Sequence, residues 1–234
     1  MKHYLGTTLA APKVELSDYP VVIVDDHQLF STSLRLALGG RGFAASELPV
    51  AELPELLGRP CPTTSGLVVL DLDLGRDERG GRIGGADQVA RLREQGWLVL
   101  IVSGSTDELE LAKAIAAGAT GWLPKSGSFE ALLDAVATAA QGSPLMTETE
   151  RSRWAATHRD HQEQVREVSR RLARLSRREQ EVLKLLSEGQ RASAIAARFV
   201  VSMPTIRTQI RSLLAKLEVT SQLEAVALVR GSSL

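Results

Sequence analysis

The sequence predicts an α/β domain built on a doubly wound, five-stranded parallel sheet, followed by an all-α domain of four helices. Three apolar runs are continuous rather than alternating, namely VVIV at 21–24, LVVL at 67–70 and LVLIV at 98–102. Such runs are typical of strands that are buried on both faces of a parallel sheet. From residue 175 onward, apolar side chains recur instead at helical spacing.

Helical patterns separate the apolar runs of the first half. A helix is expected over 27–38, where a Gly-Gly pair ends the periodicity, and a weaker strand over 43–48. Further helical patterns lie at 88–94, 108–117 and 129–140. Strand and helix therefore alternate about five times, which implies right-handed βαβ crossovers.

Chemically active side chains follow the strands at the points where they end. Asp25 and Asp26 follow the first run, Asp71 the second, Ser103 the third, and Lys125 a short apolar segment. Because open α/β sheets bind ligands at the carboxyl ends of their strands, we expect these five residues to lie together. Close carboxylates need a cation such as Mg²⁺, and a carboxylate can attack phosphorus. Asp71 is the natural nucleophile, with Lys125 and Ser103 beside the phosphoryl oxygens.

The composition is that of a globular protein whose halves differ in charge. The 234 residues are 44% hydrophobic, and residues 1–141 carry 12 basic and 18 acidic side chains against 16 and 10 in residues 142–234. The second half is therefore expected to meet polyanions. The single Cys61 excludes an internal disulfide, and no apolar stretch is long enough to span a bilayer, so we expect a cytoplasmic protein without membrane contact.

The second half predicts a helix-turn-helix. Ser176 and Glu179 form a capping box, a short alanine-rich helix follows at 192–199, and Ser202 caps a third helix. That helix carries an apolar stripe, and its other face carries Arg207, Thr208 and Arg211. Arginines four residues apart lie together on a helix and can bond guanine edges or phosphates, so this is the expected recognition helix.

Between the halves, apolar and histidine side chains alternate four and three residues apart. This heptad-like series is Trp154, His158, His161, Val165, Val168, Leu172 and Leu175. It predicts a linker helix that either pairs two chains or packs on its own domain. The expected division is a flexible extension over 1–18, an α/β domain over 19–141, a linker over 142–174 and a helix-turn-helix domain over 175–234.

The motifs of residues 20–141 resemble the receiver domain of bacterial two-component response regulators. They are the pair Asp25-Asp26, VVLDLDLG around Asp71, VSGS around Ser103 and GWLPKS around Lys125. The resemblance implies a flavodoxin-like fold with Asp71 as phosphoacceptor and a Mg²⁺ ion. The ion would be held by Asp25, Asp26, Asp71 and the backbone carbonyl of Asp73. Ser103 and Lys125 would sense the phosphoryl group, and Trp122, three residues before the lysine, would move with the hydroxyl.

Two features depart from the receiver pattern. Gly75 stands where the family usually has proline, and the stretch RDERGGRIGG at 76–85 is longer than usual. Its glycines and arginines are those of either a mobile lid beside the phosphorylation site or a loop insertion that the fold tolerates. A tolerated loop is the favoured interpretation.

Residues 175–229 resemble the LuxR-type helix-turn-helix, and joined to a receiver this indicates the NarL/FixJ family. The resemblance implies that Arg207, Thr208 and Arg211 face bases or phosphates, and that Ser202, Thr205 and Lys216 contact the DNA backbone. The segment 190–194 and the positions of Gln209 and Glu218 depart from the usual residues of the family.

These observations predict a transcription factor rather than an enzyme. A partner histidine kinase would phosphorylate Asp71, and the modified protein would form a homodimer that reads promoter half-sites. One alternative is a pseudo-receiver whose DNA binding responds to a ligand or a protein instead of phosphate. A less favoured alternative is an aspartate-based phosphatase that uses the same acidic cluster, although no segment suggests a cap over a substrate.

Overall fold

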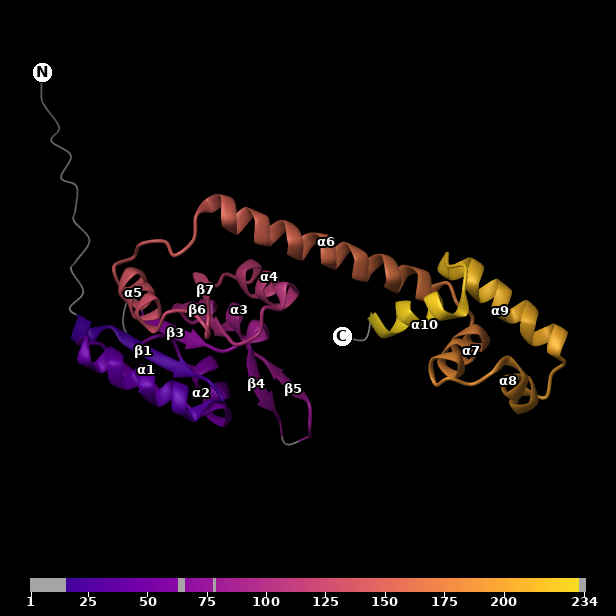
Figure 1. Cartoon of the computed structure of the whole chain (residues 1–234), viewed down its shortest axis with the longest axis horizontal. Coiled ribbons are helices and arrows are strands. Elements are labelled where there is room, and N and C mark those ends of the chain that lie inside the picture. The colour runs from indigo at the N-terminus through magenta and orange to yellow at the C-terminus, as the bar shows by residue number, and fades with distance from the viewer. Residues whose placement is uncertain (1–15, 63–65, 78, 232–234) are drawn as a thin grey trace, which may run out of the picture. The chain divides into compact units, whose positions relative to one another are not determined.

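The computed structural model describes residues 16–62, 66–77 and 79–231, and the chain divides after His158 into two compact units (Figure 1). The expected extension over 1–18 lies outside the described residues as far as residue 15, and Leu16–Asp18 forms a turn of 3-10 helix. Within the described ranges, no helix has both the length and the apolar character that a membrane span requires.

A five-stranded parallel sheet forms the centre of the first unit, as the apolar runs predict. Its strands are β1 (Pro20–Val24), β2 (Ala44–Glu47), β3 (Gly66–Leu70), β6 (Trp97–Ser103) and β7 (Gly121–Pro124). Their order is β2-β1-β3-β6-β7, and every neighbouring pair is parallel. The chain moves from β1 outward to β2 and then returns to β3, so the order reverses between β1 and β3. Ligands bind at such a switch point.

Helices cover both faces of this sheet. They are α1 (Gln28–Gly40), α2 (Leu53–Leu57), α3 (Val89–Glu94), α4 (Glu108–Ala116) and α5 (Phe129–Ala140). Successive strand residues point to opposite faces, so Val24 and Leu70 pack with α2, α3 and α4, whereas Ile23 and Val69 pack with α1 and α5. The doubly wound architecture is therefore confirmed. The five-residue α2 is too short for a helical period to reveal it in the sequence.

We expected the stretch at 76–85 to be a loop. The structure shows instead that it is part of a β-hairpin. Strands β4 (Asp73–Arg76) and β5 (Arg82–Gly84) are antiparallel, and the hairpin stands out from the sheet in Figure 1. Asp77 closes the turn, because its Oδ1 accepts hydrogen bonds from the backbone of Arg79 and Gly81 at 2.9 and 2.7 Å. A 3-10 turn, η3 (Gly85–Gln88), leads from the hairpin into α3. Such short strands lack the apolar alternation that would predict them.

A single helix, α6 (Glu148–Ala173), occupies most of the expected linker. It begins with a capping box, in which Thr147 Oγ1 accepts a hydrogen bond from the Glu150 backbone and Glu150 Oε2 accepts one from that of Thr147. Residues at both ends of the heptad-like series pack against other parts of the same chain. Trp154 packs against the core of the first unit, and Leu172 and Leu175 join that of the second.

The second unit contains four further helices, as predicted. They are α7 (Arg177–Ser187), α8 (Ala192–Phe199), α9 (Met203–Leu217) and α10 (Gln222–Gly231). The apolar stripe of α9 faces inward, and Ile206, Leu213 and Leu217 have no exposed surface. The turn between α8 and α9 passes through Val200, whose backbone is left-handed at φ 55° and ψ 45°.

Candidate functional site

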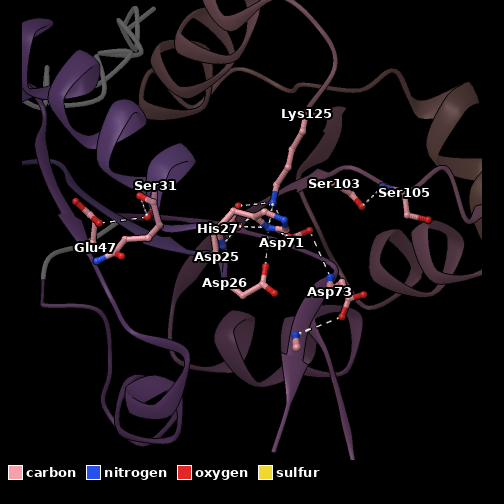
Figure 2. Close-up of polar contacts among 12 residues, drawn as sticks. Asp25, Asp26, His27, Ser31, Glu47, Asp71, Asp73, Ser103, Ser105 and Lys125 are labelled. Carbon is pink, nitrogen blue, oxygen red and sulfur yellow. Dashed lines mark hydrogen bonds and ion pairs between the residues drawn. The ribbon is translucent and has the colours of Figure 1, made fainter.

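The residues that end the central strands meet at one edge of the sheet. Lys125 follows β7, and its Nζ lies 2.6 Å from Oδ2 of Asp71 and 2.7 Å from Oδ2 of Asp25 (Figure 2). Asp25 follows β1 and Asp71 follows β3, so the lysine bridges two carboxylates that flank the switch point. This convergence is what the sequence predicts.

Burial sets the electrostatics of this edge. Asp71 is only 3% exposed, and burial raises the pKa of its carboxyl group, while the hydrogen bond from Lys125 opposes that shift. For Lys125, burial lowers the pKa, but hydrogen bonds to Asp25 and Asp71 outweigh burial and leave the pKa above its ordinary value. A carboxylate and an ammonium group are thus held in contact with little water around them.

The acidic residues offer a suitable set of ligands for a hard cation. Ligand atoms of Asp25, Asp26, His27 and Asp71 all lie within 4.8 Å of one another. Lys125 is the cation that contacts two of these carboxylates in the described structure. Three carboxylates and one ammonium group leave a surplus of negative charge, which is the condition under which Mg²⁺ binds between carboxylates. The residues therefore fit the predicted ion.

Asp73 is the first residue of the hairpin. Its backbone N–H donates to Asp71 Oδ1 at 3.3 Å, and its side chain faces Arg82, with 3.6 Å between Oδ2 and the guanidinium. Asp73 pairs with Gly84 across the hairpin, so the predicted carbonyl ligand belongs to a strand and not to a loop. This hydrogen bond joins the hairpin directly to Asp71.

His27 also belongs to this cluster, although no motif of the sequence predicts it. Its Nδ1 lies 2.7 Å from Asp26 Oδ1 and 3.3 Å from Asp25 Oδ1, and its backbone N–H donates to Asp25 at 2.8 Å. The signal was its position directly after the aspartate pair, ahead of α1. Because the ring is 69% exposed, it forms the outer wall of the cluster.

Ser103 and Trp122 have partners outside this cluster. The hydroxyl of Ser103, which is buried, accepts a hydrogen bond from the Ser105 backbone at 3.0 Å (Figure 2). The Ser103 carbonyl accepts one from the Lys125 backbone at 2.8 Å, so the two residues are linked through the main chain. Trp122 lies in β7, and its ring meets that of Trp154 edge to face, with centroids 6.1 Å apart.

In the second unit, α9 exposes the predicted reading residues. Arg207, Thr208 and Arg211 are all exposed, opposite the buried stripe. Among the described residues, no ion pair includes either arginine, so both guanidinium groups are open to an incoming anion. The Thr208 hydroxyl donates to the Pro204 carbonyl at 3.1 Å.

The residues that the resemblance assigns to the DNA backbone already have partners. Ser202 caps α9 by accepting from the Thr205 backbone at 3.3 Å, and the two hydroxyl oxygens lie 2.8 Å apart. Lys216 Nζ donates to Glu179 Oε2 at 2.7 Å. Any contact with phosphate must therefore share these groups with the domain's own hydrogen bonds.

Comparison with known proteins matches both halves. Residues 21–137 match the response regulator receiver domain, and residues 173–229 match bacterial regulatory proteins of the LuxR family. The chain is 30% identical over 219 residues to the probable transcriptional regulatory protein NarL of Mycobacterium tuberculosis, covering 88% of this chain and 91% of that protein. It is 29% identical over 219 residues to the nitrate/nitrite response regulator protein NarP of Escherichia coli K12, covering 92% and 95%.

Among solved structures, RcsB from Salmonella enterica serovar Typhimurium bound to promoter rprA is 22% identical, with a TM-score of 0.45 and coverage of 92% of this chain and 100% of that chain. The assignment depends on the two domain matches, on their order, and on the full-length relatives. The chain belongs to the NarL/FixJ family of bacterial two-component response regulators, in which a receiver domain precedes a LuxR-type DNA-binding domain.

Proposed function

We propose that a partner histidine kinase transfers a phosphoryl group to Asp71, and that this modification controls dimerisation and sequence-specific binding to promoter DNA. The contact between Lys125 Nζ and Asp71 Oδ2, at 2.6 Å, is the observation that carries the proposal. It places a cation where the transferred phosphoryl group would bring new negative charge.

The chemistry follows from the groups at the edge of the sheet. A carboxylate oxygen of Asp71 attacks phosphorus, the bond from phosphorus to the donor breaks, and an acyl phosphate remains on Asp71. Lys125 then faces the phosphoryl oxygens, and the Ser103 hydroxyl exchanges its bond to Ser105 for one of them. Mg²⁺ bound by Asp25, Asp26, Asp71 and the Asp73 carbonyl would neutralise part of the phosphoryl charge.

The proposed output is DNA recognition by α9. Arg207 and Arg211 would contact base edges or phosphates in the major groove, and Thr208 lies between them on the exposed face. Two such units in a homodimer would read half-sites about one helical turn apart. Ser202, Thr205 and Lys216 would contact the DNA backbone from the two ends of the helix.

Phosphorylation is tested by mass spectrometry of the intact protein after incubation with acetyl phosphate and Mg²⁺. We expect one added phosphoryl group on the wild type and on the control Asp160→Asn, which alters an exposed carboxylate of α6, and none on Asp71→Asn. Absence of the group from the wild type would favour the pseudo-receiver. Sustained turnover of an added phosphomonoester would favour the phosphatase.

DNA recognition is tested by mapping genomic binding sites with and without phosphorylation. Arg207→Ala is expected to weaken binding and to relax the sequence preference, whereas Arg166→Ala, which changes an exposed arginine of α6, is expected to bind as the wild type does. Equal site preference for Arg207→Ala and the wild type would refute the assignment of α9.

A further inference from the structure

The segment that leads into α6 lies along β7, which is an edge strand of the receiver sheet. Leu145 packs on Gly121, where an added Cβ would stand 2.9 Å from the Cβ of Leu145. The guanidinium group of Arg151 donates hydrogen bonds to the carbonyl oxygens of Ala119 and Thr120, at 3.2 and 3.3 Å. These contacts hold the start of the linker helix on the receiver.

A further contact of the linker helix involves Trp122, the residue that the resemblance assigns to the switch. Trp154, in the second turn of α6, meets Trp122 with the ring planes at 88° and the centroids 6.1 Å apart. Edge-to-face geometry is the favoured arrangement of an aromatic pair. Both side chains are half-buried against the receiver core, so Trp122 has the linker helix as a direct neighbour.

Trp122 is also linked through the sheet to the phosphoacceptor edge. In the β6–β7 register, Ile101 pairs with Trp122 and Ser103 pairs with Pro124, the residue before Lys125. A cavity of about 330 Å³ is lined by both tryptophans and by Thr106 and Leu111. The indole of Trp122 therefore has space to turn without displacing the strand.

We propose that Trp154 is a positioning residue of the phosphorylation switch: through Trp122 it holds the first turns of α6 on the receiver, and phosphorylation of Asp71 releases it. The inference rests on the proposed function, because the release requires a phosphoryl group on Asp71. Movement of Ser103 toward that group frees space next to β7, the Trp122 ring turns away from Trp154, and the edge-to-face contact is lost.

This arrangement makes the contact a coupling between two sites. If the docked helix opposes phosphorylation, then loss of docking must favour phosphorylation by the same factor. The interaction free energy of an edge-to-face pair corresponds to a change of about two- to tenfold in the phosphorylation equilibrium. A tryptophan that served only to fill the core would show no such coupling.

The contact itself can be followed by circular dichroism. Two indoles in edge-to-face contact couple their excited states and give a characteristic far-ultraviolet band. The chain has three tryptophans, and Trp97 lies buried at the start of β6, so Trp97→Phe isolates the pair formed by Trp122 and Trp154. The band is recorded while acetyl phosphate and Mg²⁺ are added, and the fraction of protein with a phosphoryl group on Asp71 is measured by mass spectrometry.

We expect the band to decline in proportion to phosphorylation in the wild type and in Trp97→Phe, and to persist in Asp71→Asn. A band that persists when Asp71 is fully phosphorylated overturns the inference and leaves the proposed function intact. A band that is absent before phosphorylation also overturns it. Failure of Asp71 to accept the phosphoryl group overturns the inference and the proposed function together.

The reciprocal effect is measured at limiting acetyl phosphate. Trp154→Ala is expected to raise the equilibrium ratio of phosphorylated to unmodified protein by about two- to tenfold. Trp154→Phe, which keeps a ring, is expected to fall between Trp154→Ala and the wild type, and also serves if the alanine variant unfolds. Arg159→Ala, which changes an exposed residue of the same helix, is expected to match the wild type. Equal fractions for all four proteins would rule out the coupling.

Discussion

Glu179 of α7 and Lys216 of α9 form an ion pair, with 2.7 Å between Oε2 and Nζ, and the glutamate side chain is only 7% exposed. Ser212, also on α9, donates to the other carboxylate oxygen at 2.7 Å. The same glutamate completes the capping box with Ser176. One carboxylate thus joins the start of α7 to α9.

Acid should weaken the DNA-binding unit through this carboxylate. Burial raises the pKa of Glu179, but hydrogen bonds from Lys216, Ser176 and Ser212 outweigh burial and lower the pKa from 4.5 to about 2. Because the folded pKa is the lower one, the stabilisation is complete above about pH 4.5 and is lost as the pH falls toward 2. Glu179→Gln should lower the free energy of unfolding at neutral pH by about 2 kcal/mol. Urea unfolding measures this, and Glu181→Gln, an exposed carboxylate of α7, is the control.

Replacing Val200 should stabilise the same unit. Its left-handed backbone, at φ 55° and ψ 45°, is unfavourable for a β-branched residue, and its side chain is 91% exposed, so little packing compensates. Val200→Asn is expected to raise the free energy of unfolding by about 1 kcal/mol, since asparagine tolerates this conformation. A lower urea midpoint for Val200→Asn than for the wild type would contradict the argument.

A methyl group at Gly85 should displace the backbone of Asp71. An added Cβ would lie 1.9 Å from the carbonyl oxygen of Asp71, so the backbone of β3 and the hairpin would have to separate. We expect Gly85→Ala to destabilise the receiver by more than about 2 kcal/mol and to reduce phosphorylation of Asp71. Gly39→Ala is the matched control, because its Cβ meets nothing within 4 Å. Wild-type phosphorylation and melting temperature in Gly85→Ala would refute this prediction.

Removing the lysine should move the titration of Asp71 upward. Burial already raises the pKa of Asp71, and the hydrogen bond and charge of Lys125 oppose that shift. Lys125→Met should therefore raise the pKa of Asp71 further. Because phosphorylation requires the carboxylate, it should be lost at a higher pH than in the wild type when the solution is acidified. A carboxyl group whose pKa is raised in the folded state stabilises that state at low pH. This stabilisation is lost as the pH rises through the folded pKa.

Carbon NMR of the Asp71 carboxyl group without metal follows this titration directly. Lys113→Met is the control, because Lys113 pairs with Asp87 on the surface, at 2.6 Å, and contacts neither Asp25 nor Asp71 in the described structure. An unchanged or lowered pKa of Asp71 in Lys125→Met would show that the lysine does not set the charge of the site.

The sequence was most informative where burial determines the spacing of apolar residues along the chain. Continuous apolar runs predicted the parallel strands, and the rule that functional side chains follow strand ends predicted that Asp25, Asp71 and Lys125 lie together. The spacing of Trp154 and Leu172 predicted α6, but spacing cannot tell which partner covers a helix face. Here the two ends of the series pack on different units.

The sequence was least informative where local hydrogen bonds decide the structure. The turn of the hairpin depends on Asp77 accepting two backbone bonds, and its strands contain glycines and arginines that carry no apolar alternation. The contribution of His27 to the cluster was likewise missed. Its position depends on the direction in which α1 leaves β1, which no short-range pattern specifies.

The hairpin also makes part of this receiver replaceable. Asp73 pairs with Gly84, and the Gly85 N–H donates to the Leu72 carbonyl at 2.9 Å, so the two ends of the inserted segment are fastened side by side. A longer or shorter tip between them changes only the entropy of closing a loop, which grows slowly with length. We therefore expect that the segment between Asp73 and Gly84 can be exchanged for a tag, a reporter or another loop while Asp71 keeps its place.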